Sequence, residues 1–549
     1  MRTAVALIPA AAVLGFVFAF RFLSFTGFPN DHFVYVARAQ QILLGAWPVR
    51  DFVDPGFLGM YAASAAALTV FGHNLLGEAL LVFGGFAVAA ALSYGLARAA
   101  AGSFVVAIVA VVLQALAYPR SYSYPKLVLH AVAIALCWHY LARPTLARRV
   151  GLAALVAVSF LFRPDYGVVI GLVTLFAVVW AETGPVRARI RAAFQLAAAT
   201  AVCMIPWMVF VQSAVGLVTH LRSVLEFTGA KADVGRIGWP PFPIQLRPDP
   251  GLASRLDHEA FLYYAFLLLP VVGAIVVFRR GAAAARMPDA SGRLWVVIIL
   301  ALCTHATLLR DPLHNRLADV AVPQTILGAW LFTAAWRAAP PVRLPVRLGL
   351  RAAAVAMVWV LALSVVRLGN AREQFGHIPI LRPDAVRDRA ATVLWALRDI
   401  DGSAGVPRTE RTTLGPFVAY LRACTEPDDR VMYVGYAPET YFFAHRPFAA
   451  GQVVFEGSYY TSPKDQELML ARLRREQAAV IALPDEYVAN FRQVFSGIDS
   501  YLRARYVRVG NIDLPGDRRG DVFLDRARAH RGVYEPLGWP CLSDGSSRT

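Results

Sequence analysis

The chain has 549 residues, of which 57% are apolar and 17% are charged. Globular domains carry about 25% charged residues, whereas long uncharged runs recur along most of this sequence. The composition therefore excludes an ordinary soluble enzyme and predicts a polytopic α-helical membrane protein.

The net charge of +17 would suggest a nucleic-acid partner in a soluble protein. Residues 371–549, however, hold 24 basic and 23 acidic residues, so almost the whole excess lies in residues 1–370. There it gathers in short loops, as the positive-inside rule expects of cytoplasmic loops. We expect a lipid bilayer as partner and no nucleic acid. The clusters are Arg143, Arg148 and Arg149, then Arg187, Arg189 and Arg191, then Arg279, Arg280 and Arg286, then Arg337, Arg343, Arg347 and Arg351.

The apolar runs predict eleven membrane spans. We expect residues 3–23 to be an uncleaved first span, because Phe20-Arg21-Phe22-Leu23 offers no small-residue cleavage site for a secretory signal. The run Phe57–Phe71 reaches only about 22 Å of a roughly 30 Å core, so it predicts a juxtamembrane or re-entrant helix. Thirteen spans would preserve the same topology. The eleven are 3–23, 75–97, 103–119, 127–142, 150–162, 166–181, 192–216, 259–278, 293–309, 317–336 and 352–369.

With the Arg clusters and the N-terminus cytoplasmic, an odd number of spans puts residues 370–549 outside. The predicted domains are a transmembrane core, 1–370, with outer loops 24–56 and 217–258, and an extracytoplasmic α/β domain, 385–549. Strand patterns at 431–435, 478–483 and 506–509 alternate with helical patterns at 463–477 and 486–504, which predicts a largely parallel sheet. Cys424 and Cys541 both fall in this domain, where oxidation would permit a disulfide without requiring one.

Polar residues gather in the segments that this topology places outside. Ionisable residues at span ends are costly unless they pair or serve a site. In the first outer loop, Asp31, Tyr35 and Arg38 share one helical face. The alternative is that Asp31 caps a helix beginning near His32, and that Asp51 and Asp54 initiate turns before Pro55.

These residues resemble the GT-C superfamily of integral-membrane glycosyltransferases, and within it the bacterial enzymes similar to aminoarabinose transferases and protein O-mannosyltransferases. The resemblance rests on Asp31 with Tyr35 four positions on, then Asp51-Phe52, Asp54-Pro55, Leu68-Thr69-Val70-Phe71-Gly72 and Leu96-Ala97-Arg98. The motifs cover residues 1–200, and the rest of the chain resembles the family in its architecture. Two departures stand out. His32 replaces a frequent second acid, which leaves a divalent metal open, with Asp31 and His32 as its ligands if one binds. Pro55-Gly56-Phe57 replaces a frequent Pro-Pro-Leu, which leaves the substrate open.

The resemblance implies transfer of a sugar from a polyprenyl-phosphate donor to an envelope glycan, lipid or protein at the outer face of the bacterial inner membrane. Asp31 is the first choice for the general base, followed by Asp54 and Asp51. Cations would stabilise the departing lipid phosphate, with interface anchoring or local Arg–Asp pairing as the alternative for each. The candidates are Arg310, His314, Arg316, Arg163, Arg120 and Lys126 for the phosphate, and Tyr35, His32 and Asp165 for the substrate.

Two other classes of protein remain open. A transporter or lipid flippase would also have many spans, although the chain has no internal repeat. A lipid-linked polysaccharide ligase or polymerase would share the long outer loops. A nucleotide-sugar enzyme is disfavoured, because Asp399-Ile400-Asp401 ends an amphipathic run and predicts a turn, and no P-loop occurs.

Overall fold

The computed structural model describes residues 2–234, 239–244, 256–284, 288–308, 314–337, 344–379, 382–399, 408–457, 460–514 and 518–542. The described chain is mostly helical, with a small sheet towards its C-terminal end. It forms two compact units. We call Met1–Ser24, Val82–Trp207 and Gly235–Arg389 the helical unit, and Phe25–Leu81, Met208–Val234 and Ala390–Thr549 the mixed unit.

These units divide the chain differently from the predicted boundary between residues 370 and 385. The first outer loop and the short helix after it belong to the mixed unit, together with the C-terminal sheet. Aromatic packing is one reason. The ring of Phe33 lies 5.8 Å from that of Phe442 and 5.4 Å from that of Phe443, and all three side chains are buried.

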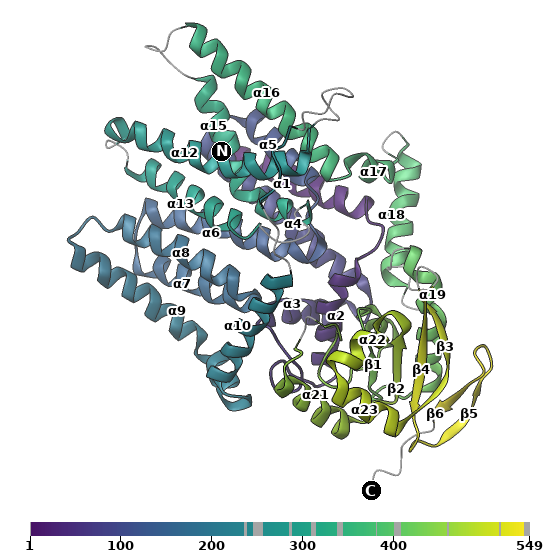
Figure 1. Ribbon diagram of the computed structural model, residues 1–549. Coiled ribbons are helices and arrows are strands. Elements are labelled where there is room, and N and C mark those ends of the chain that lie inside the picture. The colour runs from purple at the N-terminus through teal and green to yellow at the C-terminus, as the bar shows by residue number, and fades with distance from the viewer. Residues whose placement is uncertain are drawn as a thin grey trace. The chain divides into compact units, whose positions relative to one another are not determined.

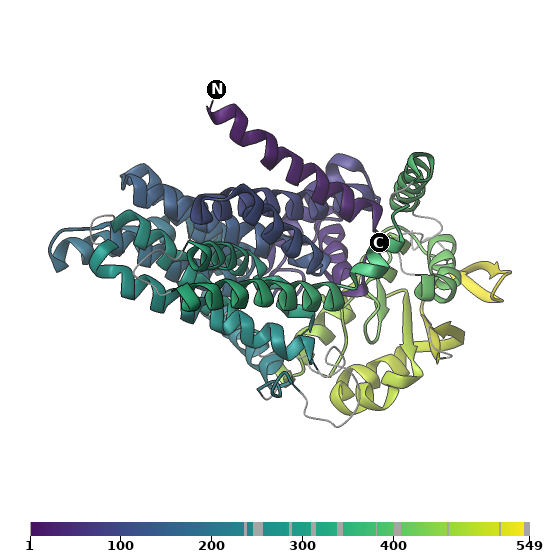
Figure 2. The same cartoon turned by 90° about the horizontal axis from the view of Figure 1, so that it is seen from above.

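The helices of the helical unit lie alongside one another in both views (Figures 1 and 2). Helices α7 and α8 approach each other closely at Gly167 of α8. A Cβ added there would lie 2.6 Å from Cβ of Phe160 in α7. The helices are α1 (Arg2–Leu23), α4 (Leu75–Ala101, which begins in the mixed unit), α5 (Phe104–Leu116), α6 (Tyr124–Ala142), α7 (Leu146–Phe162), α8 (Pro164–Ala181), α9 (Val186–Ala214), α12 (His258–Ala284), α13 (Pro288–His305), α14 (His314–Leu317), α15 (Ala321–Trp336), α16 (Leu344–Leu368) and α17 (Ala371–Gly376), with the short 3₁₀ turns η1 (Ser121–Ser123) and η2 (Ala318–Val320).

Each of the eleven predicted spans overlaps helical structure over most of its described residues. By length and composition, six helices of the described chain can cross a membrane, so the protein is a helical membrane protein. The total of eleven stays a prediction. The short helix α3 (Leu58–Phe71) has 14 residues, close to the predicted run. The six are Leu75–Ala101, Ser121–Ala142, Pro164–Ala181, Val186–Ala214, His258–Arg279 and Leu344–Leu368.

The mixed unit combines helices with two sheets. The predicted helix 463–477 is confirmed, whereas the predicted helix 486–504 is two helices that meet at Phe495, whose buried ring packs on Phe455 and Phe491. The helices are α2 (Asn30–Leu43), α3, α10 (Leu217–Val234), α18 (Pro383–Arg398, which begins in the helical unit), α19 (Arg408–Cys424), α20 (Glu439–Ala444), α21 (Pro463–Glu476), α22 (Asp485–Val494) and α23 (Ser496–Arg505).

The larger sheet has four strands in the order β1-β2-β4-β3. Strand β1 (Val431–Tyr433) pairs in parallel with β2 (Val480–Pro484), but β4 (Arg518–Asp525) pairs antiparallel with both β2 and β3 (Tyr506–Leu514). The prediction of a largely parallel sheet is therefore wrong. Its cause is β4, a strand that the pattern did not predict and that lies between β2 and β3. Strands β5 (His530–Tyr534) and β6 (Trp539–Leu542) form the second sheet.

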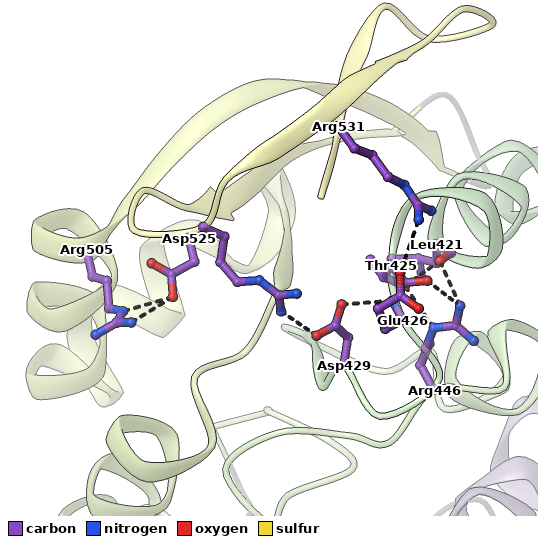
Figure 3. A network of polar contacts seen from close by, with 9 residues as sticks. Leu421, Thr425, Glu426, Asp429, Arg446, Arg505, Asp525 and Arg531 are labelled. Carbon is purple, nitrogen blue, oxygen red and sulfur yellow. Dashed lines mark hydrogen bonds and ion pairs between the residues drawn. The ribbon is translucent and has the colours of Figure 1, made fainter. Parts of the chain in front are cut away.

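Polar contacts hold the end of α19 in place (Figure 3). The buried guanidinium of Arg446 donates to the carbonyls of Leu421 and Thr425 and to the Thr425 hydroxyl, so it satisfies acceptors that a helix C-terminus leaves unpaired. Next to this point, a disulfide joins Cys424 to Cys541 of β6. The structure thus contains the disulfide that the sequence left open.

Candidate functional site

Asp31 lies in the first turn of α2, where its side chain is half-buried. The phenol of Tyr436, in the loop after β1, donates a 2.6 Å hydrogen bond to Oδ1 of Asp31. The N-cap of α2 is Pro29, a residue with no side-chain acceptor. The alternative that Asp31 caps the helix therefore does not hold, although its carboxylate still lies at the positive end of the helix dipole.

His32, the residue after Asp31, forms a buried pair with Glu78. Nε2 of His32 is 2.9 Å from Oε1 of Glu78, and the hydroxyl of Ser64 donates to the same oxygen at 3.0 Å. Phe28 stacks on the imidazole with ring centroids 4.3 Å apart. His32 and Glu78 are each only 1% exposed. The imidazole that was predicted to contact a substrate or a metal is therefore buried against Glu78.

The other two predicted acids form turns. Oδ1 of Asp54 accepts the backbone N–H groups of Gly56 at 2.9 Å and Phe57 at 2.8 Å. Oδ2 of Asp51 accepts the Trp47 N–H and two Arg50 N–H groups. Burial opposes ionisation of Asp51, but the Arg50 guanidinium and the Trp47 amide outweigh it and lower the pKa of this carboxyl. Asp51 is therefore a weak base, and Asp54 is held in a turn, so Asp31 is the best placed of the three.

Arg38 and Asp54 belong to one buried polar cluster. Nη1 of Arg38 donates to the Tyr61 hydroxyl at 3.2 Å. Burial lowers the pKa of the guanidinium, but Tyr61, Tyr460 and Asp54 together raise it above its usual value. Tyr35, the predicted substrate contact, is also buried, between the rings of Phe57 and Tyr61. We infer that this cluster stabilises the packing of α2, α3 and the loop between them.

The helical unit contains a separate cluster of cations. Nη2 of Arg120 lies 3.6 Å and Nζ of Lys126 3.7 Å from Oδ2 of the buried Asp319. Arg163 donates to both carboxylate oxygens of Asp165 at 3.0 Å. Lys126 also interacts electrostatically with Arg163, Asp165 and Arg316. Lys126, Arg120, Arg163 and Arg316 thus belong to one group of cations, a kind of group that suits a phosphate.

Two predicted phosphate ligands cannot be placed. Arg310 lies outside the described residues, and only the backbone of His314 is described, in α14. The Asp399-Ile400-Asp401 motif likewise lies mostly outside them. Within the described part of the chain, no group of three or more His, Cys, Asp or Glu side chains could hold a metal ion.

No family model and no curated protein matches this chain.

Sequence reasoning missed the residues that fasten α2. The amide of Gln40 donates to the carbonyls of Tyr441 at 3.0 Å and Arg446 at 3.2 Å. Oε1 of Gln41 accepts the backbone N–H of Phe448 at 3.1 Å. Two adjacent glutamines in a helix with many apolar residues were the available signal, because buried amides need partners. The segment that follows β1 thus contacts α2 directly.

Proposed function

We propose that this protein is a GT-C-type glycosyltransferase that transfers a sugar from a polyprenyl-phosphate donor to an acceptor at the outer face of the bacterial inner membrane. The observation that carries the proposal is the half-buried Asp31 carboxylate, held at the start of α2 by Tyr436. In the reaction, the acceptor hydroxyl attacks the anomeric carbon of the sugar and its proton passes to Asp31. The bond between the anomeric carbon and the phosphate oxygen breaks, and polyprenyl phosphate leaves.

The cation cluster of the helical unit supports a phosphate-bearing substrate. Negative charge develops on the phosphate as the sugar departs, and positioned cations stabilise it most in the transition state. Lys126 and Arg120 share the single carboxylate of Asp319, so their charges are only partly neutralised.

An apolar cavity supports a lipid-linked substrate. Its volume is about 680 Å³, and it lies among α5, α12, α15 and α16 of the helical unit. Apart from Gln114, Gln324 and Thr325, the side chains that line it are apolar. A cavity of this chemistry suits a hydrocarbon chain. A lipid flippase would need the same property, so the cavity does not separate the two functions.

The disulfide supports the outer location. Disulfides persist in oxidising compartments such as the bacterial periplasm and are rare in the cytoplasm. Cys424 and Cys541 lie in the region that the charge distribution predicts to be outside.

Binding of the reaction product tests the phosphate and lipid parts of the proposal without knowledge of the sugar. Undecaprenyl phosphate should raise the unfolding temperature of the purified protein in detergent, because a ligand that binds only the folded state stabilises it. Lys126→Ala should weaken this effect, whereas Lys464→Ala, which removes an exposed lysine of the mixed unit, should not. An equal response of all three proteins would contradict the assigned cation cluster.

Sugar transfer then separates a transferase from a flippase. Polyprenyl phosphates carrying mannose, glucose or arabinose are supplied with cell-envelope membranes as the acceptor source, and release of free polyprenyl phosphate is measured. A transferase cleaves the bond to the sugar, whereas a flippase moves the intact lipid between leaflets. Lipid movement without cleavage would favour the flippase.

A further inference from the structure

The contact between Tyr436 and Asp31 joins the loop after β1 to the start of α2. We infer that Tyr436 is a positioning residue for Asp31, so that the C-terminal region supplies part of the site itself. This inference rests on the proposed role of Asp31 as general base. The O–H···O distance of 2.6 Å lies in the range of hydrogen bonds to an ionised oxygen, about 2.5–2.7 Å.

The backbone that carries Tyr436 is fixed. Gly435 and Phe455 exchange two backbone hydrogen bonds, of 3.0 and 3.2 Å. Gly435 has φ of +101°, and an added Cβ there would lie 2.3 Å from the ring of Tyr487. Only glycine fits this position, which sets the direction in which the chain reaches Tyr436.

The helix that carries Asp31 is fixed at its other end. Gln40 and Gln41 bind the segment 441–448 through three hydrogen bonds. Tyr436 and these contacts belong to the same stretch of chain, so α2 is held by it at both ends. The contacts at both ends therefore fix the position of Asp31 relative to Tyr436.

A phenol that donates to a carboxylate fixes the orientation of that carboxylate. Proton transfer requires the base within hydrogen-bond reach of the attacking hydroxyl. A purely structural contact would have no such effect on catalysis.

The test compares Tyr436→Phe with Tyr441→Phe in the full-length protein. The hydroxyl of Tyr441 accepts the Tyr433 N–H at 3.0 Å, in the same segment and away from Asp31. Each variant loses one hydroxyl and one hydrogen bond. The readouts are kcat and KM of sugar transfer, because a residue that orients the base affects kcat more than KM.

We expect Tyr436→Phe to lower kcat roughly 10- to 100-fold and to leave KM nearly unchanged, because the orientation of the base matters in the transition state. Tyr441→Phe should change neither. Thermal unfolding of both variants reports any loss of fold.

Two results would overturn the inference. One is a kcat in Tyr436→Phe equal to that in Tyr441→Phe. The other is a lower kcat that accompanies an equal loss of thermal stability, which would make the contact structural only. Failure of the proposed function looks different, because the unchanged protein would then release no polyprenyl phosphate, and failure of the proposed base alone would leave transfer by Asp31→Asn intact.

Discussion

The Tyr436 hydroxyl lies 2.6 Å from Oδ1 of Asp31, although 405 positions separate the two residues in the sequence. This contact distinguishes Asp31 from the other acids of the first outer loop. Asp51 binds Arg50 and a backbone N–H, and Asp54 binds two backbone N–H groups. Oδ1 of Asp31 accepts instead from a neutral donor, the phenol of Tyr436.

Replacement of Asp31 by Asn should lower sugar transfer by roughly 10²–10⁴-fold, the usual contribution of a general base. Asn keeps the shape of the side chain and can still accept from Tyr436, so the protein should fold and insert normally. Transfer by the purified variant from a polyprenyl-phosphate sugar is the measurement. Full activity would remove Asp31 from the mechanism.

Asp51→Asn and Asp54→Asn are the matched controls for that experiment. An Asn oxygen can still accept the N–H groups that form both turns, and the exposed Arg50–Asp51 pair contributes only about 0–1 kcal/mol. Both variants should transfer sugar at close to the normal rate. Loss of transfer in Asp54→Asn alone would assign the base to Asp54.

The topology predicts that Thr183 and Ser500 lie on opposite sides of the membrane. Thr183 belongs to a loop next to an Arg cluster, Ser500 belongs to α23, and both are exposed. Single cysteines at these positions, in a Cys203→Ala background, should react with a membrane-impermeant maleimide only from the inside for Thr183→Cys and only from the outside for Ser500→Cys. Labelling of both from one side would mean that the span parity is misassigned.

The disulfide should contribute to the stability of the mixed unit. It joins residues 117 positions apart, and removal of such a cross-link costs about 2–4 kcal/mol in the free energy of unfolding. We expect Cys541→Ser to unfold at a lower temperature than the unchanged protein, and reducing agent to lower the unfolding temperature of the unchanged protein only. Free thiols at both positions in protein taken from the membrane would contradict the outer location.

A pair of histidines should make the mixed unit sensitive to acid. The rings of His73 and His445 stack with centroids 4.1 Å apart, and Nε2 of His73 lies 3.0 Å from the Phe442 carbonyl. Burial, followed by the charge of His445 and by Arg422, lowers the pKa of His73 from 6.5 to about 4. Burial, followed by Arg446 and Arg422, also lowers the pKa of His445.

Because the folded state disfavours protonation of His73, its neutral form contributes stability that is complete above pH 6.5 and is lost as the pH falls towards 4. The loss should reach about 3 kcal/mol at most. Thermal unfolding between pH 7 and pH 4 measures it. His73→Gln keeps a donor for the Phe442 carbonyl and cannot titrate, so its unfolding temperature should fall less over this range. An identical pH dependence in the variant would exclude His73 as the cause.

The sequence by itself determined the long apolar helices of this protein. Run length and apolar composition are local properties, and a chain in a bilayer must satisfy its backbone groups within each segment. The described residues of the eleven predicted spans therefore fall mostly on helical structure. The strands β1, β2 and the start of β3 were predictable for a similar reason, because short apolar runs between turn residues favour strands.

Only the tertiary structure decided which residues meet. The direction of β4, the burial of His32 against Glu78 and the contact between Asp31 and Tyr436 depend on segments far apart in the chain. Their free energy comes from burial and from hydrogen bonds that form only after these segments pack, so no local pattern records it. The sequence placed an acid at the start of a helix, and the fold supplied the phenol that makes this acid the best-placed candidate base.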